Sequence, residues 1–195
     1  MGLDSVELLM EFENYFKIQI PDSEAEKILT IQNMIDVVAR HLNIEYVNAG
    51  MRDSIFKAVA NFLQHEQNVN YPIQPNDKIA NYLEVSDNEI WNNLGKAIGL
   101  LLPRPDNYDP QSTKLRHKFK KLIGWTPLYD WHSVTVGQFI DAVCARNYQQ
   151  LLKGNILTSK YEIFIAIAGI TVDKIGVDYF EVSPEKSFTS DLGVD

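Results

Sequence analysis

Few side chains in this sequence stand where they could catalyse a reaction. The single cysteine, Cys144, lies in the apolar phase of a predicted helix and has no base at a matching spacing. We therefore expect a buried thiol rather than a nucleophile. His117 and His132 also have no carboxylate partner at a recognisable spacing. The sequence contains no glycine-rich phosphate loop, catalytic-triad order or metal-ligand spacing, so these residues indicate a protein that is not an enzyme.

Charge divides the sequence into two different kinds of surface. Residues 1–50 and 158–195 together hold 16 acidic and 6 basic side chains, a formal charge of −10, whereas residues 51–157 hold 10 acidic and 12 basic ones. The basic side chains of the middle concentrate between Lys114 and Leu122. We expect this segment to form the solvent-exposed face of a helix. We do not expect nucleic acid to be a partner. This asymmetry suggests two domains.

Composition places the chain among globular proteins of a reducing compartment. One cysteine excludes an internal disulfide framework and favours a cytoplasmic protein. No cationic segment precedes an apolar stretch at the N-terminus, so we expect no secretory signal. The most apolar run, Ile163 to Val172, is shorter than the roughly 20 residues that span a membrane.

Helical periodicity dominates both ends of the chain. Asp4 and Glu7 have the spacing of a capping box, and Thr30 and Ser159 stand where two further helices would begin. After each of these helix starts, apolar residues recur at helical spacing. They are Leu8, Phe12, Tyr15 and Phe16 in the first helix, Ile31, Met34, Ile35, Val38 and Leu42 in the second, and Phe164, Ile167, Ala168 and Ile175 in the third. These amphipathic stripes cannot all be buried without one another, so we expect the two ends to pack together.

The middle of the chain is also predicted to be helical. Met51 opens one helical pattern, Ser86 and Glu89 form a capping box before another, and Thr135 precedes a third. Pro103 ends the second pattern. No segment alternates polar and apolar residues with a period of two, so the expected fold class is all-α without a real sheet.

The two ends, read in reverse order, resemble one known family. Ser187 to Asp195 reads S-F-T-S-D-L-G-V-D, and Leu3 to Glu13 reads L-D-S-V-E-L-L-M-E-F-E. In that order the segments resemble the modification loop and second helix of acyl carrier proteins. The resemblance continues through Phe16–Asp22, Ala25–Ile28 and Thr30–Gln32, covering roughly residues 1–43 and 158–195. The family's first helix lies here at the C-terminus, which implies a circularly permuted order.

This resemblance implies two small four-helix bundles. One would be assembled from residues 1–46 and 158–195, within one chain or by exchange between two chains of a homodimer. The other, residues 51–153, would be a degenerate carrier-like domain with an inserted basic helix. Thr30–Val38 is similar to Thr135–Val143, and Leu192–Asp195 is similar to Leu83–Ser86, which supports an internal repeat.

The family carries 4′-phosphopantetheine on a serine that follows the Asp of D-L-G-x-D, four residues before V-E-L. Counting from Asp195 and from Val6 leads to the same position, which Gly2 occupies. Ser5, next to Asp4, is a second candidate for attachment, with an ordinary helical residue as the alternative. A phosphodiester at either place would be stabilised by the free N–H groups and the dipole of the helix. In the middle repeat the same position falls on Asp87.

The resemblance also implies partners and a function. Asp4, Glu7, Glu11 and Glu13 correspond to the helix that basic enzymes of acyl metabolism recognise, with a solvated face as the alternative. A phosphopantetheinyl transferase would be a further partner. The favoured function is an acyl carrier or carrier-like module of fatty-acid or polyketide-type metabolism with a vacant or displaced arm. A protein-interaction module that keeps the carrier surface is the alternative, and an acyltransferase or hydrolase dependent on Cys144 is a third.

Overall fold

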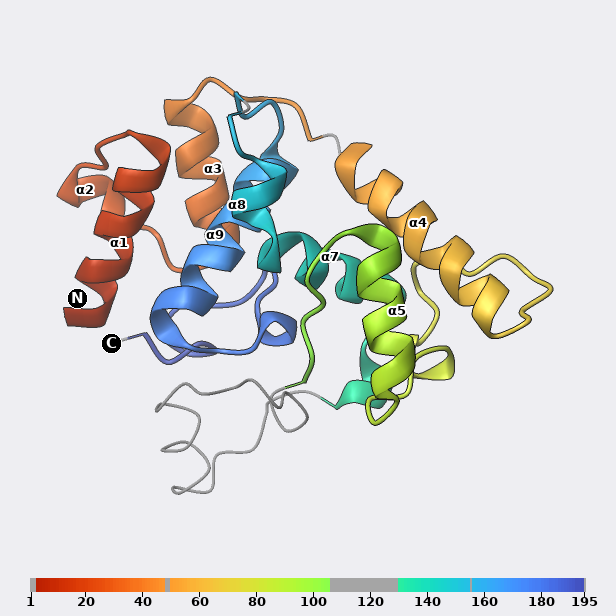
Figure 1. Cartoon of the computed structure of the whole chain (residues 1–195). Helices are drawn as coiled ribbons and strands as arrows, with labels where there is room; N and C mark the ends of the chain where they lie inside the picture. Colours follow the sequence, from red (N-terminus) through yellow and green to blue (C-terminus); the bar gives the residue numbers. More distant parts are fainter. Residues whose placement is uncertain (1–2, 48–49, 106–129, 155, 195) are drawn as a thin grey trace. The chain divides into compact units, whose positions relative to one another are not determined.

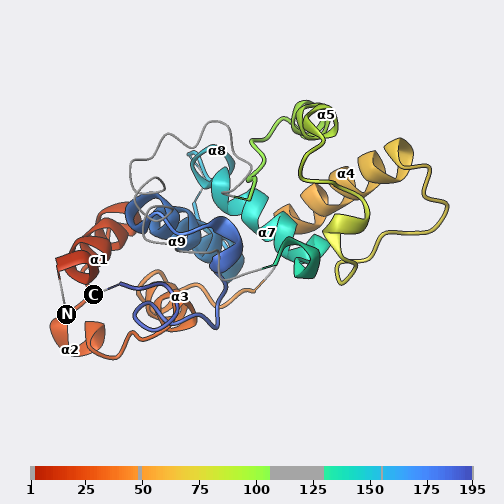
Figure 2. The ribbon, with the colours of Figure 1, turned by 90° about the horizontal axis from the view of Figure 1, so that it is seen from below.

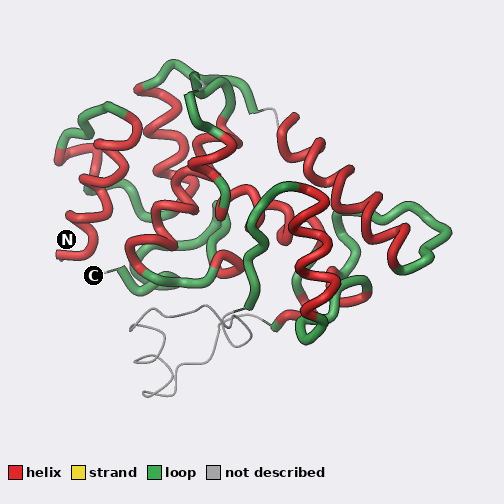
Figure 3. Tube along the Cα trace, in the orientation of Figure 1, coloured by secondary structure: helices red, strands yellow, loops and turns green. Residues whose placement is uncertain are grey.

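The computed structural model describes residues 3–47, 50–105, 130–154 and 156–194. Within these residues every regular element is helical, apart from isolated bridges, which confirms the all-α fold class (Figure 3). None of the helices in the described ranges is long and apolar enough to cross a membrane. Gly2, Asp195, His117 and the basic segment from Lys114 to Leu122 lie outside the described residues.

Contacts divide the chain into two compact units (Figure 1). The terminal unit comprises Met1–Ala49 and Tyr148–Asp195, and the middle unit comprises Gly50–Asn147. The terminal unit contains helices α1 (Leu3–Phe16), α2 (Asp22–Ala25), α3 (Ile31–His41), α8 (Tyr148–Leu151) and α9 (Lys160–Ile175), with the 3₁₀ turn η4 (Tyr179–Glu181). The middle unit contains α4 (Gly50–Glu66), α5 (Asn88–Ile98) and α7 (Val136–Arg146), with the 3₁₀ turns η1 (Ile79–Asn81) and η3 (Trp131–Ser133).

Helix α9 is the centre of the terminal unit. All of its residues from Ile163 to Val172 are buried, as is Ile175, so the helix is apolar on every side. A helix of this kind must be surrounded by other elements. Helices α1, α3 and α8 pack against it, and Figure 2 shows α1 and α3 next to it. The two ends of the chain therefore share one core, whose members from α1 and α3 include Leu8, Phe12, Phe16, Ile31, Met34 and Val38.

Backbone hydrogen bonds fasten the C-terminal segment to the start of α3. The N–H of Ile31 donates to the carbonyl of Lys186 at 3.0 Å, and that of Gln32 donates to Pro184 at 2.7 Å. In return, the N–H of Phe188 donates to the carbonyl of Leu29 at 3.0 Å. An isolated antiparallel bridge joins Thr30 and Ser187 at the same point. We call residues 184–188 the strap of the terminal unit, because they close it across α3.

The middle unit is built around α4, which packs against α5 and α7. Val59 and Leu63 of α4 are fully buried, and the Arg52 guanidinium bonds the Asp141 carboxylate of α7 at 2.6 Å. Cys144 is fully buried in α7, which confirms the expected buried thiol. The unit's interior also contains aromatic rings from α5, η3 and α7.

Three local expectations are wrong. Helix α1 begins at Leu3, so Asp4 belongs to its first turn and is not the N-cap. The cap of α5 is Asp87, whose carboxylate accepts the N–H groups of Glu89 and Ile90, whereas the Ser86 hydroxyl bonds Glu84. His132 does have a carboxylate partner, because its Nδ1 lies 3.2 Å from Asp130 Oδ1. By contrast, the helices predicted to open at Thr30 and Ser159 are present as α3 and α9, and the structure shows these two residues as their N-caps.

Replacing Ile167 by alanine tests the central place of α9. Because Ile167 is fully buried, we expect the terminal unit to lose about 2–5 kcal/mol of unfolding free energy. Urea denaturation followed by far-UV circular dichroism measures the loss. Ile156→Ala is the matched control, since Ile156 is 89% exposed and should change stability by less than about 0.5 kcal/mol. Equal effects of the two substitutions would contradict the packing described above.

Candidate functional site

The terminal unit contains an apolar cavity between α1, α2, α3 and the C-terminal segment. Its volume is about 380 Å³, within the range of small-molecule sites in proteins. Leu8, Leu9 and Phe12 of α1 form one wall, and Met34 of α3 lies in another. The remaining lining residues come from both ends of the chain and are Ser5, Ala25, Glu26, Ile28, Leu29, Phe188, Thr189 and Val194.

The strap determines where the C-terminal segment meets this cavity. Phe188, held by its hydrogen bond to Leu29, places its ring 6.2 Å from that of Phe12. The Asp191 carboxylate accepts the N–H of Ser187 at 2.8 Å, and the N–H of Val194 donates to the Phe188 carbonyl at 2.9 Å. These bonds fold residues 187–194 into a tight turn that ends beside the first turns of α1. Figures 1 and 2 both show these two parts of the chain side by side.

Ser5 lies in the first turns of α1 and borders the cavity. Its side chain is half-buried. The first four N–H groups of a helix have no partner within the helix, so this end of α1 favours a bound anion. Ser5 therefore combines a hydroxyl, a helix start and an apolar cavity wall. Gly2 stands three residues earlier in the sequence, outside the described residues.

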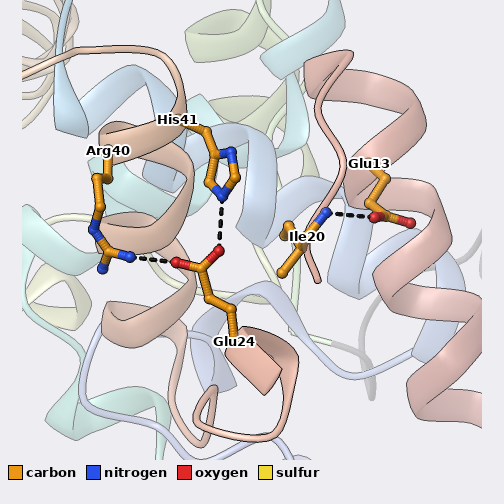
Figure 4. Close-up of polar contacts among 5 residues, drawn as sticks. All are labelled: Glu13, Ile20, Glu24, Arg40 and His41. Carbon is orange, nitrogen blue, oxygen red and sulfur yellow. Dashed lines mark hydrogen bonds and ion pairs between the residues drawn. The ribbon is translucent and has the colours of Figure 1, made fainter. Parts of the chain in front are cut away.

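The acidic residues of α1 make different contacts. The Lys174 ammonium of α9 lies 2.6 Å from Glu11 Oε1, and this bond raises the pKa of Lys174. Glu13 Oε1 accepts the N–H of Ile20 at 2.7 Å and so ties the loop after α1 back to the helix (Figure 4). Glu7 is exposed, and Asp4 is half-buried. Glu11 and Glu13 thus have structural bonds, and Glu7 is the most accessible of the four carboxylates.

Helix α2, which contributes to the cavity wall, is tethered to the end of α3. Figure 4 shows the Glu24 carboxylate between Arg40 and His41. The Glu24 oxygens bond Arg40 and, at 2.7 Å, the Nε2 of His41. The hydrogen bond from His41 is the largest cause that lowers the pKa of Glu24, and the charge of Arg40 lowers it further. The N-cap of α2, Pro21, offers no side-chain hydrogen bond, so this tether is important for its position.

A second cavity lies toward the other end of α1. Its volume is about 290 Å³, and its lining includes Tyr15, Leu42 and Leu152. Burial raises the pKa of Tyr15 and of Tyr148, whose rings are 5.6 Å apart. No sequence pattern singled out this place.

The sequence located the residues of the first cavity but not the cavity itself. Leu8, Phe12 and Met34 were expected to be buried, and they are. An empty volume between them depends on how side chains from four segments meet, which periodicity does not describe. The tether from Glu24 was also missed, because it joins residues of α2 and α3 that share no local motif.

Comparison with known proteins finds a partial similarity. The chain is 58% identical over 39 residues to the acyl carrier protein of Chlorobium phaeobacteroides, which is 20% of this chain and 50% of that protein. It is 61% identical over 37 residues to the acyl carrier protein of Chloroherpeton thalassium, covering 19% and 46% respectively. The chain thus spans about half the length of the curated relatives it matches. No family model and no solved structure matches the chain.

Replacing Glu24 by glutamine tests the tether of α2 and its pH dependence. The folded carboxyl has a pKa below its ordinary value of 4.5, so it binds its proton less tightly than the unfolded one does. The tether therefore stabilises the folded unit above pH 4.5, and this contribution is lost as the pH falls through the lowered pKa. Because Arg40 is largely exposed, we expect Glu24→Gln to cost less than about 1 kcal/mol at neutral pH.

Urea denaturation of both proteins between neutral and acid pH measures this difference. It should shrink toward zero on the acid side, whereas the exposed neighbour Glu26→Gln should have little effect at any pH. A difference between wild type and Glu24→Gln that stays constant into acid would contradict the role given to the ionised carboxylate.

Proposed function

We propose that the terminal unit is an acyl-chain-binding unit of the acyl-carrier type. The observation that carries this proposal is the apolar cavity of about 380 Å³ beside the start of α1. The partial similarity to acyl carrier proteins supports the same class of function. An apolar chain in this cavity would contact Leu8, Leu9 and Met34, while its polar end would lie near Ser5 and the N–H groups of α1.

Under this proposal the terminal unit has the helices of a carrier in permuted order. Helix α9 takes the part of the family's first helix, residues 176–194 that of the modification loop, and α1, α2 and α3 follow. The packing of α1 and α3 on α9 supports this assignment, because it joins segments from opposite ends of the chain. The strap holds the loop segment against the start of α3 by backbone hydrogen bonds, which keeps the two ends of the chain in one unit.

The prosthetic group implied by the resemblance, 4′-phosphopantetheine, fits this chain only in part. The helix start and the apolar cavity would suit the arm and its load. The hydroxyl is the difficulty, because the spacing leads to Gly2, and Ser5 stands three residues further on. We therefore propose that the usual attachment position is vacant and that the unit binds acyl chains without a covalent link.

A second candidate function is a protein-interaction module. Val6 and Met10 of α1 and Leu29 after α2 are 41%, 54% and 65% exposed. Val6 and Met10 share one face of α1, and Glu7 lies exposed beside them. Exposed apolar side chains with a carboxylate nearby suit a basic partner with an apolar contact surface.

Binding of a dansyl-labelled fatty acid tests the proposed function. We expect saturable binding to the wild-type chain, and at least about a tenfold loss of affinity in Met34→Phe, because the broad, rigid ring replaces a flexible lining side chain and narrows the cavity. Leu157→Phe, which changes the second cavity, is the matched control and should keep the wild-type affinity. Equal affinities for all three proteins would place the fatty acid elsewhere and would favour the interaction module.

Intact-mass measurement after incubation with coenzyme A and a phosphopantetheinyl transferase tests the vacant arm position. We expect no increase for the wild-type chain. A Gly2→Ser chain without its initiator methionine should gain one arm, and adding Ser5→Ala to it should not remove the label. Labelling of the wild type that Ser5→Ala abolishes would instead identify Ser5 as the attachment residue.

A further inference from the structure

The middle unit repeats the hydrogen bonds that close the terminal unit. The N–H of Val136 donates to the Asp77 carbonyl at 2.8 Å, that of Gly137 to Pro75 at 2.8 Å, and that of Ile79 to Val134 at 3.0 Å. The terminal unit has the same three bonds, from Ile31 to Lys186, from Gln32 to Pro184 and from Phe188 to Leu29. Each residue of one set has its counterpart in the other at the spacings of the sequence repeat.

Side-chain interactions also correspond between the two units. Thr30 and Thr135 each cap their helix in a capping box and each form an isolated bridge, to Ser187 and to Lys78. Asp36 of α3 bonds Lys160 of α9 at 2.7 Å, and its counterpart Asp141 of α7 bonds Arg52 of α4. Helix α4 packs against α5 and α7 as α9 packs against α1 and α3. Coincidence in sequence alone would not produce matching backbone bonds, caps and ion pairs.

The interiors differ where the terminal unit has its cavity. Met34, a cavity-lining residue, corresponds to Phe139 of the middle unit, and Glu26 corresponds to Trp131 at the same spacing. The rings of Trp131 and Phe139 lie 6.4 Å apart, and the Trp91 ring lies 5.9 Å from each of them. All three are buried, and they come from η3, α7 and α5, the counterparts of the segments that line the cavity.

The position that corresponds to the arm is also changed. Asp87 occupies it, and its carboxylate accepts the N–H groups of Glu89 and Ile90 at 3.0 and 3.1 Å. These are N–H groups of the first turn of α5, where a phosphate would otherwise bind. Trp91 is fixed nearby, because its indole N–H donates to the Glu84 carbonyl at 3.0 Å and the Arg104 guanidinium lies 5.0 Å from its ring centre.

We infer that the middle unit is a second copy of the terminal unit's framework that is closed to apolar chains. The rings of Trp91, Trp131 and Phe139 occupy the space that is a cavity in the terminal unit, and Trp131 and Phe139 decide the difference. Within the described residues, the middle unit therefore offers no apolar-chain site at the place that corresponds to the cavity of the terminal unit. This inference does not depend on whether the terminal unit binds acyl chains.

Quenching of tryptophan emission by a fatty acid brominated at its terminal carbon tests the inference. All three tryptophans of the chain belong to the middle unit, so their emission reports on that unit alone. Bromine quenches an indole on contact. In a Trp125→Phe background we expect saturating quencher to leave the emission of Trp91 and Trp131 unchanged. Saturable quenching in this background would overturn the inference.

Removing rings from the interior of the middle unit tests the inference in the opposite direction. Trp131→Ala with Phe139→Met removes ring volume from the cluster, and an enclosed apolar space of this kind binds small apolar molecules. We expect the remaining Trp91 to lose about half of its emission to the same quencher, through van der Waals contact. Phe139→Met alone is the milder variant if the double variant does not fold, and circular dichroism decides that point.

The outcomes separate this inference from the proposed function. Failure of the dansyl-labelled fatty acid to bind the wild type would contradict the proposed function. The quenching results would still test whether the middle unit is closed to apolar chains. Folded variants whose Trp91 emission is not quenched would overturn the assignment of the ring cluster to the place of the cavity.

Discussion

The structure of the terminal unit depends on the burial of α9. A helix that is apolar on every side has no stable place in water, and α1 and α3 by themselves have only one apolar face each. Packing α1 and α3 against α9 buries the apolar faces of all three helices, although they come from opposite ends of the chain. The strap then fixes the C-terminal segment beside α1, and the cavity follows from that placement.

The two units show how one framework accommodates two interiors. Backbone bonds, caps and the Asp36 or Asp141 ion pair are common to both, so they belong to the framework. The space enclosed depends on a few side chains, with Met34 in one unit and Phe139 in the other. The cavity of the first unit opens to solvent, so part of its apolar lining stays in contact with water, whereas the rings of the second unit are buried against one another. Ligand binding to the terminal unit would offset this exposure.

Periodicity and capping rules predicted much of the fold. The stripes of Leu8, Phe12 and Ile167 and the caps Thr30 and Ser159 depend on neighbouring residues, which the sequence displays directly. The cap of α5 was displaced by one residue, because Asp and Ser both cap helices and spacing alone does not choose between Ser86 and Asp87. Helix α1 begins at Leu3, two residues before the start that a cap at Asp4 predicts. The cavity and the Glu24 tether depend on contacts between separate segments, so no local pattern indicated them.

Amide hydrogen exchange across the strap is the most direct test of the central claim, that both ends of the chain form one unit. The N–H groups of Ile31, Gln32 and Phe188 donate across the junction, so they should exchange slowly in the full chain. In a chain that ends at residue 157, Ile31 and Gln32 should exchange at unprotected rates, with loss of helicity in α1 and α3. A truncated chain that stays monomeric, helical and equally protected at these amides would contradict the account.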